Sequence, residues 1–340
     1  MHLNRNNLIR KIKNGFFKTP LDCLITIILV LAISWATLST IKWLAFEANW
    51  TVVTDNLHLY TFGGYPKLEQ WRPFFWLVTL GTLSSLTLFC SHLTQLKKSL
   101  PFLWVLIIPF GIFLIRGGIG LEIIPSRNWG GFLLTVILTC CSASIALPLG
   151  ILLAIGRQTN LKLLNLICRI YIDVMRSVPL IAVLFFGQLL IPLFLPVDLE
   201  INRFNRAVWA FGLFAASYVA EDIRGGLQAI PSTQKEAAKV LGLSSTQTFQ
   251  LIVLPQALRT ALPALTNQAI GLLQNTSLMA LLGLIELLGI SRSILANPEF
   301  IGRYLEVYVW LAGVYWFVCT IIALMSRNIE RQLDPVKSFK

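Results

Sequence analysis

An apolar stretch near the C-terminal end of the chain, residues 262–284, is interrupted in its middle by a run of polar residues. The run is Gln274, Asn275, Thr276 and Ser277. Amides and hydroxyls donate and accept hydrogen bonds without carrying charge, so their chemistry is the recognition of a polar solute. In a bilayer such a run needs either a wet cavity or hydrogen bonds to partner helices. We favour the cavity, because membrane transporters place solute sites near the middle of the bilayer.

Two opposite charges stand in another apolar stretch. Asp173 and Arg176 are three residues apart, so on one helix they can face each other, and burial of a charge in a membrane is costly enough to require a partner. They form either a structural ion pair or a contact to a solute, and we favour the ion pair. Pro179 follows within one turn, and its missing N–H is expected to bend the helix and expose carbonyl groups to a cavity.

Two further acidic residues, Glu221 and Asp222, end an apolar stretch just before Arg224. One interpretation is that they hold the following loop through charge pairs. The other is that they are solvated charges at the membrane interface. Both interpretations stay open at the level of sequence.

The sequence lacks the motifs of the common catalytic and metal sites. It has no Walker A loop, no nucleophile elbow and no metal-binding histidine pair, since His2, His58 and His92 are isolated. The six cysteines form no C-x-x-C pair, and we expect them to pack as small apolar residues. The chain is therefore expected to be no enzyme and to bind no metal and no cofactor.

Composition determines the class of protein. The 340 residues are 56% hydrophobic and only 13% charged, which is more apolar side chain than one soluble core can bury. The net charge of +12 is spread over short runs between apolar stretches, which argues against a nucleic-acid partner. We predict an all-α polytopic membrane protein with about eight spans. The expected spans are Leu21–Leu44, Phe74–Leu93, Phe102–Leu121, Trp129–Gly156, Ile170–Leu195, Ala207–Ile223, Leu262–Leu284 and Leu305–Met325.

The distribution of lysine and arginine predicts the orientation. With the N-terminus in the cytoplasm, about two-thirds of these residues fall on the cytoplasmic side, as the positive-inside rule requires. An even number of spans returns the C-terminus to the same side. We therefore expect both termini in the cytoplasm.

The chain divides at about residue 126. Residues 1–126 contain three plain hydrophobic spans and a polar outer segment, and form the expected accessory region. Residues 127–332 contain five spans, nearly all of the polar residues inside predicted spans, and the longest cytoplasmic connection, at about 229–258. In that connection Pro231 can begin a short helix and Gly242 can end it. Function is expected to reside in the second region.

The long connection resembles the signature of the permease subunits of bacterial ABC importers: E-A-A, three residues, G, nine residues, then I-x-L-P. The matching residues, with every spacing kept, are Glu236, Ala237, Ala238, Gly242, Ile252, Leu254 and Pro255. The resemblance implies a type I ABC importer permease core of five helices, here preceded by three others. It also implies that the short helix docks on an ATPase subunit and transmits its motion. We call residues 229–258 the coupling loop.

Three other segments, 175–180, 218–226 and 273–278, resemble the polar amino-acid uptake permeases, the histidine, arginine and glutamine importer group. The resemblance implies that the substrate pathway includes Ser177, Leu180 and the polar run at 274–277. The three N-terminal spans look like the long permease subunit of general L-amino-acid importers. One departure is that Gln274 and Asn275 stand where many members have Lys-Asp. This weakens any case for a site built around a cationic side chain.

The resemblance also implies partners. They are a second permease that forms a heterodimer with this chain, two ATP-binding-cassette ATPase subunits that hold ATP and Mg²⁺, and a periplasmic or external amino-acid-binding protein. The implied substrate is an amino acid and the implied location is the bacterial inner membrane. The alternative from another class is an ion-coupled secondary amino-acid transporter. That class predicts inverted repeats and broken helices in both halves, and we find no such repeat.

Overall fold

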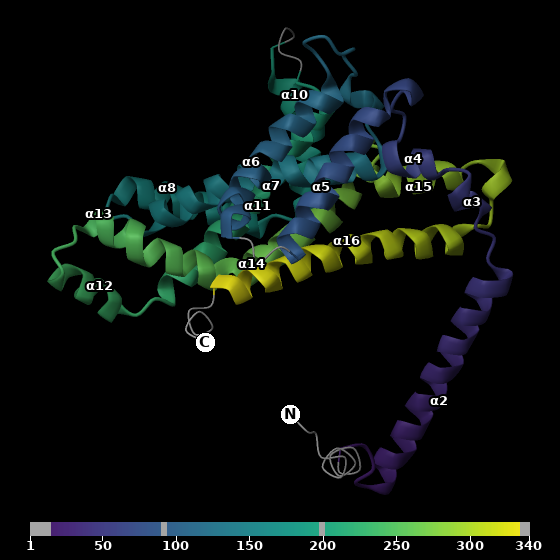
Figure 1. The fold of residues 1–340 in the computed structure, drawn as a ribbon, viewed down its shortest axis with the longest axis horizontal. Helices are drawn as coiled ribbons and strands as arrows, with labels where there is room; N and C mark the ends of the chain where they lie inside the picture. The colour runs from purple at the N-terminus through teal and green to yellow at the C-terminus, as the bar shows by residue number, and fades with distance from the viewer. Residues whose placement is uncertain (1–14, 90–93, 197–200, 334–340) are drawn as a thin grey trace. The chain divides into compact units, whose positions relative to one another are not determined.

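The computed structural model describes residues 15–89, 94–196 and 201–333, which fold into helices joined by loops (Figure 1). These residues contain no β-strand, so the all-α prediction is confirmed. Labels with η denote short 3-10 or π helices. The elements in chain order are α2 (Pro20–Lys42), η1 (Trp43–Glu47), α3 (Thr51–Thr54), α4 (Leu57–Phe62), η2 (Lys67–Glu69), α5 (Trp71–Phe89), α6 (Thr94–Arg116), η3 (Ser126–Asn128), α7 (Gly131–Gln158), α8 (Lys162–Ser177), α9 (Leu180–Phe185), η4 (Phe186–Leu190), α10 (Ile191–Phe194), α11 (Arg203–Gln228), α12 (Ser232–Val240), α13 (Ser245–Thr248), η5 (Phe249–Val253), α14 (Leu254–Asn275), η6 (Thr276–Leu282), α15 (Leu287–Leu295), η7 (Pro298–Phe300) and α16 (Tyr304–Leu333).

The chain forms two compact units, Met1–Thr51 and Val52–Lys340. The first is carried by α2, an apolar helix without a buried residue. Its start is defined by a capping box in which Thr19 and Asp22 each accept a backbone hydrogen bond from the other residue. An apolar helix exposed on every side needs lipid or another chain around it, so α2 suits a membrane span.

Each predicted span overlaps helical structure, but some bounds differ. The span Phe102–Leu121 runs past the end of α6 at Arg116, and the span Trp129–Gly156 begins before α7 does at Gly131. Leu93 and the residues just before it lie outside the described part. Four of the described helices are long and apolar enough to cross a membrane alone, or five spans if one bent pair is counted as a single span. A multi-pass membrane protein is therefore established, while the total of about eight spans stays a prediction.

The predicted span Ile170–Leu195 needs correction, because it is not one continuous helix. α8 begins at Lys162, earlier than predicted, and a bend of 105° separates it from the helical stretch Leu180–Phe194. The cause is local. Val178 adopts an extended conformation, with φ −96° and ψ 136°, as expected for a residue before proline, and Pro179 has no N–H to continue the helix.

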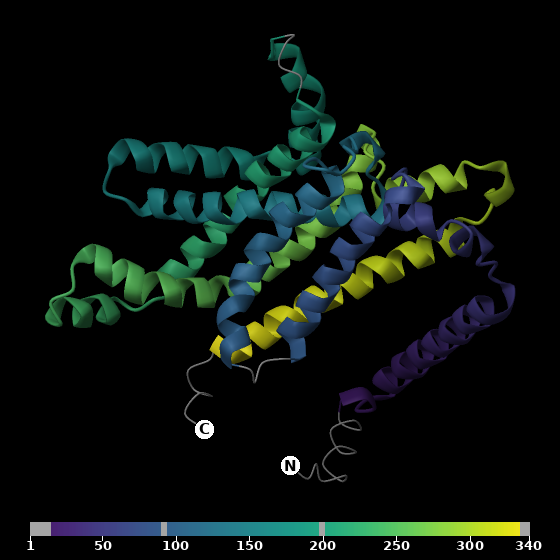
Figure 2. The same cartoon turned by 45° about the horizontal axis from the view of Figure 1, so that its top comes forward.

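The second unit is built around α11, which makes its most extensive contacts with α7 and its next most extensive with α14. Figure 2 shows α8 running alongside α7, and the two helices are in contact. Glycines allow the close approach of α7 and α11. A Cβ atom on Gly150 would lie 2.4 Å from Val219, and one on Gly212 would lie 2.9 Å from Ile145. Small residues at such contacts are typical of membrane helix pairs.

The first turn of α7 is joined to the start of α15 through the backbone. The N–H of Gly131 donates to the carbonyl of Ile285 at 2.9 Å. Glu286 is fully buried and accepts the N–H groups of Leu288 and Gly289, each at 2.9 Å, which caps α15. α4 contacts both α7 and α15, so the residues after position 51 belong to the same unit as the core. The domain boundary at residue 126 stays a prediction.

The end of α5 is held by α16. The side-chain amide of Asn328 donates to the carbonyls of Thr87 and Leu88, at 2.8 and 3.0 Å. The last carbonyls of a helix have no partner within it, so this contact satisfies part of the C-terminal end of α5. The accessory helix is thereby attached to the last helix of the core.

The packing of α11 against α14 predicts opposite outcomes for two adjacent glycines. A Cβ atom on Gly226 would lie 2.4 Å from the carbonyl oxygen of Ala257, whereas one on Gly225 would meet nothing within 4 Å. Gly226→Ala is therefore expected to lower the free energy of unfolding by about 1–3 kcal/mol, and Gly225→Ala to raise it by up to about 1 kcal/mol. Melting temperatures of the protein purified in detergent measure the difference. Equal values for the two variants would contradict this packing.

Candidate functional site

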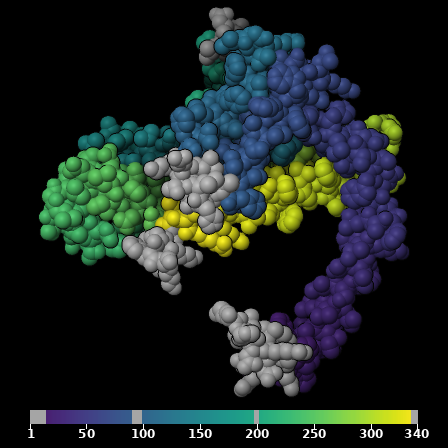
Figure 3. Space-filling view, viewed as in Figure 1, coloured from purple at the N-terminus to yellow at the C-terminus, as the bar shows by residue number. Residues whose placement is uncertain are grey.

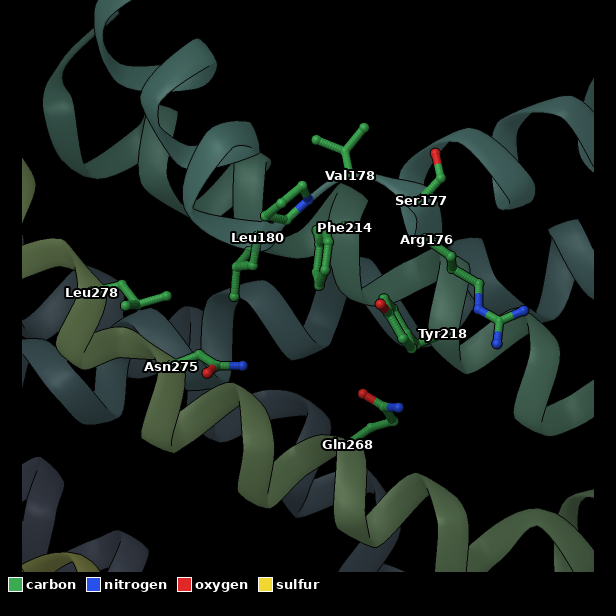
Figure 4. Close-up of a pocket in the computed structure, with 10 residues that line it drawn as sticks. Arg176, Ser177, Val178, Leu180, Phe214, Tyr218, Gln268, Asn275 and Leu278 are labelled. Atoms are coloured by element: carbon green, nitrogen blue, oxygen red, sulfur yellow. The ribbon is translucent and has the colours of Figure 1, made fainter.

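A cavity of about 550 Å³ lies beside the bend between α8 and α9 (Figure 4). Its wall combines that bend with one face of α11 and one face of α14. A volume of this size is within the range of small-molecule sites. The lining residues are Arg176, Ser177, Val178, Pro179, Leu180, Phe214, Tyr218, Gln268, Asn275 and Leu278.

Helix periodicity brings the walls of the cavity together. Phe214 and Tyr218 are four residues apart on α11, and Gln268 and Asn275 are seven apart on α14, so each pair lies on one face of its helix. Figure 4 shows the two pairs on opposite sides of the cavity. Sequence reasoning missed Phe214, Tyr218 and Gln268. The spacing of two helical turns from Asn275 was the signal that could have identified Gln268.

The polar run at 274–277 is divided by the structure. Asn275 lines the cavity, but the amide of Gln274 approaches the Sγ atom of Cys319 on α16 at 3.7 Å. Thr276 is buried and its hydroxyl donates to a carbonyl of the preceding turn at 2.7 Å. Ser277 also lies outside the lining. Of the four residues only Asn275 lines this cavity, because consecutive residues on a helix point in different directions and α14 changes to a 3-10 helix at Thr276. The part of the other three in solute passage stays a prediction.

The two predicted pathway residues at the bend both line the cavity. The hydroxyl of Ser177 donates to the carbonyl of Val174 at 2.8 Å, within its own helix. Leu180 begins α9 directly after Pro179. Their part in solute passage stays a prediction.

A cluster of ion pairs borders the cavity and is centred on Glu221 of α11. Its carboxylate contacts Arg157 of α7 at 2.8 Å, Arg176 of α8 at 3.5 Å and the Nε atom of Arg224 at 2.6 Å. Asp173 of α8, which is more exposed, also belongs to the cluster, because its carboxylate pairs with Arg157 at 3.5 Å. The cluster therefore ties together the ends of three helices. We call these five residues the Glu221 cluster.

The predicted ion pair between Asp173 and Arg176 is corrected by this arrangement, since each residue pairs with a different helix instead. The side chain of Glu221 is 17% exposed and that of Asp173 is 55% exposed. A less solvated carboxylate attracts a guanidinium more strongly, which is why Arg176 pairs with Glu221 and not with Asp173. Asp222, next in the chain, has its Oδ2 atom buried without a hydrogen-bond partner among the described residues.

The coupling loop joins α11 to α14 and includes α12, α13 and η5. The space-filling view shows the loop as a projecting lobe of the second unit (Figure 3). Glu236 and Ala237 on α12 are exposed and Ala238 is buried. Two apolar side chains at the end of α12 are also exposed: Val240 is 88% exposed and Leu241 is 78% exposed. Such a surface is available to another protein.

Gly242 ends α12 in the left-handed region, at φ +77°. Its N–H donates to the carbonyl of Lys239 at 3.0 Å, and the N–H of Leu243 donates to that of Ala238 at 3.1 Å. These two bonds form a Schellman motif, in which glycine is preferred because it has no Cβ atom. The glycine of the motif is therefore required by the turn itself.

The other motif residues build the turn from η5 into α14. Ile252 lies in η5, Leu254 begins α14 and Pro255 occupies its first turn. Proline supplies no N–H for the carbonyls one turn before it, and the wider π-helical turn of η5 accommodates that loss. η5 contacts α12, so this turn is the base against which the exposed helix packs.

The connectivity links the coupling loop to the cavity. α11 carries Phe214 and Tyr218, α14 carries Gln268 and Asn275, and the loop joins the two helices directly. The loop that carries α12 is therefore connected through the chain to both of these walls of the cavity. Within the described residues no group of three or more His, Cys, Asp or Glu side chains is arranged to hold a metal ion.

Comparison with known proteins gives consistent matches. Residues 146–335 match the family described as binding-protein-dependent transport system inner membrane component. The chain is 35% identical to the inner membrane amino-acid ABC transporter permease protein YhdY of Escherichia coli K12, over 84% of this chain and 78% of YhdY. That match covers 289 residues, more than the stretch from residue 127 to the end, so part of the accessory region is shared.

Two further similarities concern the core. The chain is 39% identical to the glutamate/glutamine/aspartate/asparagine transport system permease protein BztC of Rhodobacter capsulatus, over 62% of this chain and 49% of BztC. A chain from the crystal structure of an amino acid ABC transporter with histidines is 28% identical, with a TM-score of 0.54, over 59% of this chain and 92% of the other. The core fold is therefore that of an ABC transporter membrane subunit.

Proposed function

The chain belongs to the family of binding-protein-dependent transport system inner membrane components, and from this premise we propose that it is the permease subunit of an ATP-driven amino-acid importer. The observation that carries the proposal is the cavity whose walls, α11 and α14, are joined by the coupling loop. The names of YhdY and BztC support amino acids as the solute. The family match and the loop disfavour the alternative, an ion-coupled secondary transporter.

The proposed complex contains a second permease, with which this chain forms a heterodimer, and two ATPase subunits. ATP and Mg²⁺ are held and ATP is hydrolysed on those subunits, since the sequence of this chain has no Walker A loop. A periplasmic binding protein delivers the amino acid. The exposed face of α12, with Glu236, Val240 and Leu241, is the proposed contact to an ATPase subunit.

The coupling role is tested by Glu236→Lys and Gly242→Val. Glu236 is exposed, so its replacement leaves the packing intact, while a β-branched residue at Gly242 is strained at φ +77°. Membrane insertion should be normal, and amino-acid-stimulated ATP hydrolysis by the assembled complex should fall about tenfold or more, which corresponds to about 1.4 kcal/mol. Glu299→Lys, an identical charge change at an exposed residue outside the loop, is the control. Normal transport by both loop variants would refute the role.

The proposed orientation places both termini and the coupling loop in the cytoplasm, and it rests on the positive-inside rule. In a variant without native cysteines, a membrane-impermeant thiol reagent added outside should label a cysteine at Asp55 and not one at Gln247. Both positions are exposed, so access to the reagent depends on the side of the membrane. Labelling of position 247 from outside would reverse the orientation and exclude ATPase contact there.

Selectivity is expected to be broad, with neutral amino acids accepted and much of the discrimination left to the binding protein. Asn275 faces the cavity and the amide of Gln274 faces α16, which provides a matched pair of substitutions. Asn275→Asp should shift competitive uptake of labelled leucine, glutamate and arginine about fivefold toward arginine, because a carboxylate pairs with a cation better than an amide does. Gln274→Glu should leave the profile unchanged. An unchanged profile in Asn275→Asp would remove Asn275 from the pathway.

A further inference from the structure

Three guanidinium groups share the carboxylate of Glu221, and the neighbouring carboxylate of Asp222 also attracts Arg176. Arg157 and Arg224 lie at 2.8 and 2.6 Å from the Glu221 carboxylate, much closer than Arg176 at 3.5 Å. The side chain of Arg176 is also the most exposed of the three, at 38% against 20% and 29%. Arg176 is therefore the guanidinium held least firmly by Glu221.

Arg176 also belongs to the cavity wall. Its guanidinium lies 5.4 Å from the centre of the Tyr218 ring, and Figure 4 shows the two side chains next to each other. Among the described residues that line the cavity it is the only one with a formal charge. A guanidinium has five N–H donors, and the contact to Glu221 involves only the Nη1 atom of Arg176, so the group can also donate to an anion in the cavity.

The remaining polar groups of the cavity complement a zwitterion. Gln268 and Asn275 lie across from Tyr218 and offer amide oxygens that can accept hydrogen bonds from an ammonium group. A guanidinium presents paired donors that match the two oxygens of a carboxylate. The cavity thus contains complementary groups for both charges that every free amino acid carries.

We propose that Arg176 binds the α-carboxylate of the transported amino acid in exchange for its ion pair with Glu221. The proposal deepens the proposed function and rests on it. Because the α-carboxylate is common to all amino acids, the contact is compatible with broad selectivity. The exchange also leaves Glu221 to Arg157 and Arg224, and Arg224 lies one turn before the coupling loop, so an occupied cavity differs from an empty one at the start of that loop.

The test measures binding to the purified complex of both permeases and the ATPase subunits, without the binding protein. The probes are labelled leucine, glutamate and arginine, each competed by its own α-carboxamide. The wild-type complex should bind the amino acid about tenfold to a hundredfold more tightly than its carboxamide, as expected for a hydrogen-bonded charge pair. Arg176→Gln should abolish that ratio, and Arg176→Lys should retain part of it. Arg169→Gln, an exposed arginine two turns earlier on α8, should leave it unchanged.

A second variant, Glu221→Gln, is expected to change the ratio of amino-acid affinity to carboxamide affinity in the opposite direction. If Glu221 competes with the solute for Arg176, Glu221→Gln should raise the ratio above that of the wild type, whereas loss of a merely structural residue would lower it or leave it unchanged. The ratio does not depend on how much of each variant is folded. An undiminished ratio in Arg176→Gln, or no rise in Glu221→Gln, would overturn the proposal. A wild-type complex that neither binds nor transports any amino acid would instead overturn the proposed function.

Discussion

The arrangement of the second unit depends on the close approach of α11 to both α7 and α14. Within a bilayer there is little hydrophobic driving force between helices, so association relies on van der Waals contact and hydrogen bonds. Gly150, Gly212 and Gly226 lie where a Cβ atom would collide with the neighbouring helix. Because α11 also contacts α8 and α9, it lies against every α-helix that contributes to the cavity wall.

The break at Pro179 supplies the other half of the site. The 105° bend between α8 and α9 lies at the cavity, which is lined by the bend itself together with α11 and α14. The same bend places the last turn of α8 near Glu221, where charged groups on three helices satisfy one another. Charges at the edge of an apolar core are tolerated only when they are paired in this way.

α11 carries both residues that line the cavity and residues that form ion pairs with neighbouring helices. Phe214 and Tyr218 face the cavity, and about one turn later Glu221 and Arg224 connect to the neighbouring helices before the coupling loop begins. The loop in turn is shaped by its own motif, since Gly242 closes the Schellman turn of α12 and Pro255 lies in the first turn of α14, directly after the π-helical turn. The cavity and the loop are therefore joined by short, continuous segments of chain, which is the connection that the proposed function requires.

The sequence by itself determined the features that depend on local chemistry. Hydropathy predicts the membrane class and where helices occur, Pro179 predicts the bend, and the spacing from Glu236 to Pro255 identifies the coupling loop, because each is encoded within one or two helical turns. Only the tertiary structure decided which side chains meet. Asp173 and Arg176 pair with other helices, Gln274 turns toward Cys319, and Tyr218 and Gln268 enter the cavity wall. The reason is that periodicity specifies which residues share a face of a helix, while the rotation of each helix against its neighbours is set by close packing between distant segments.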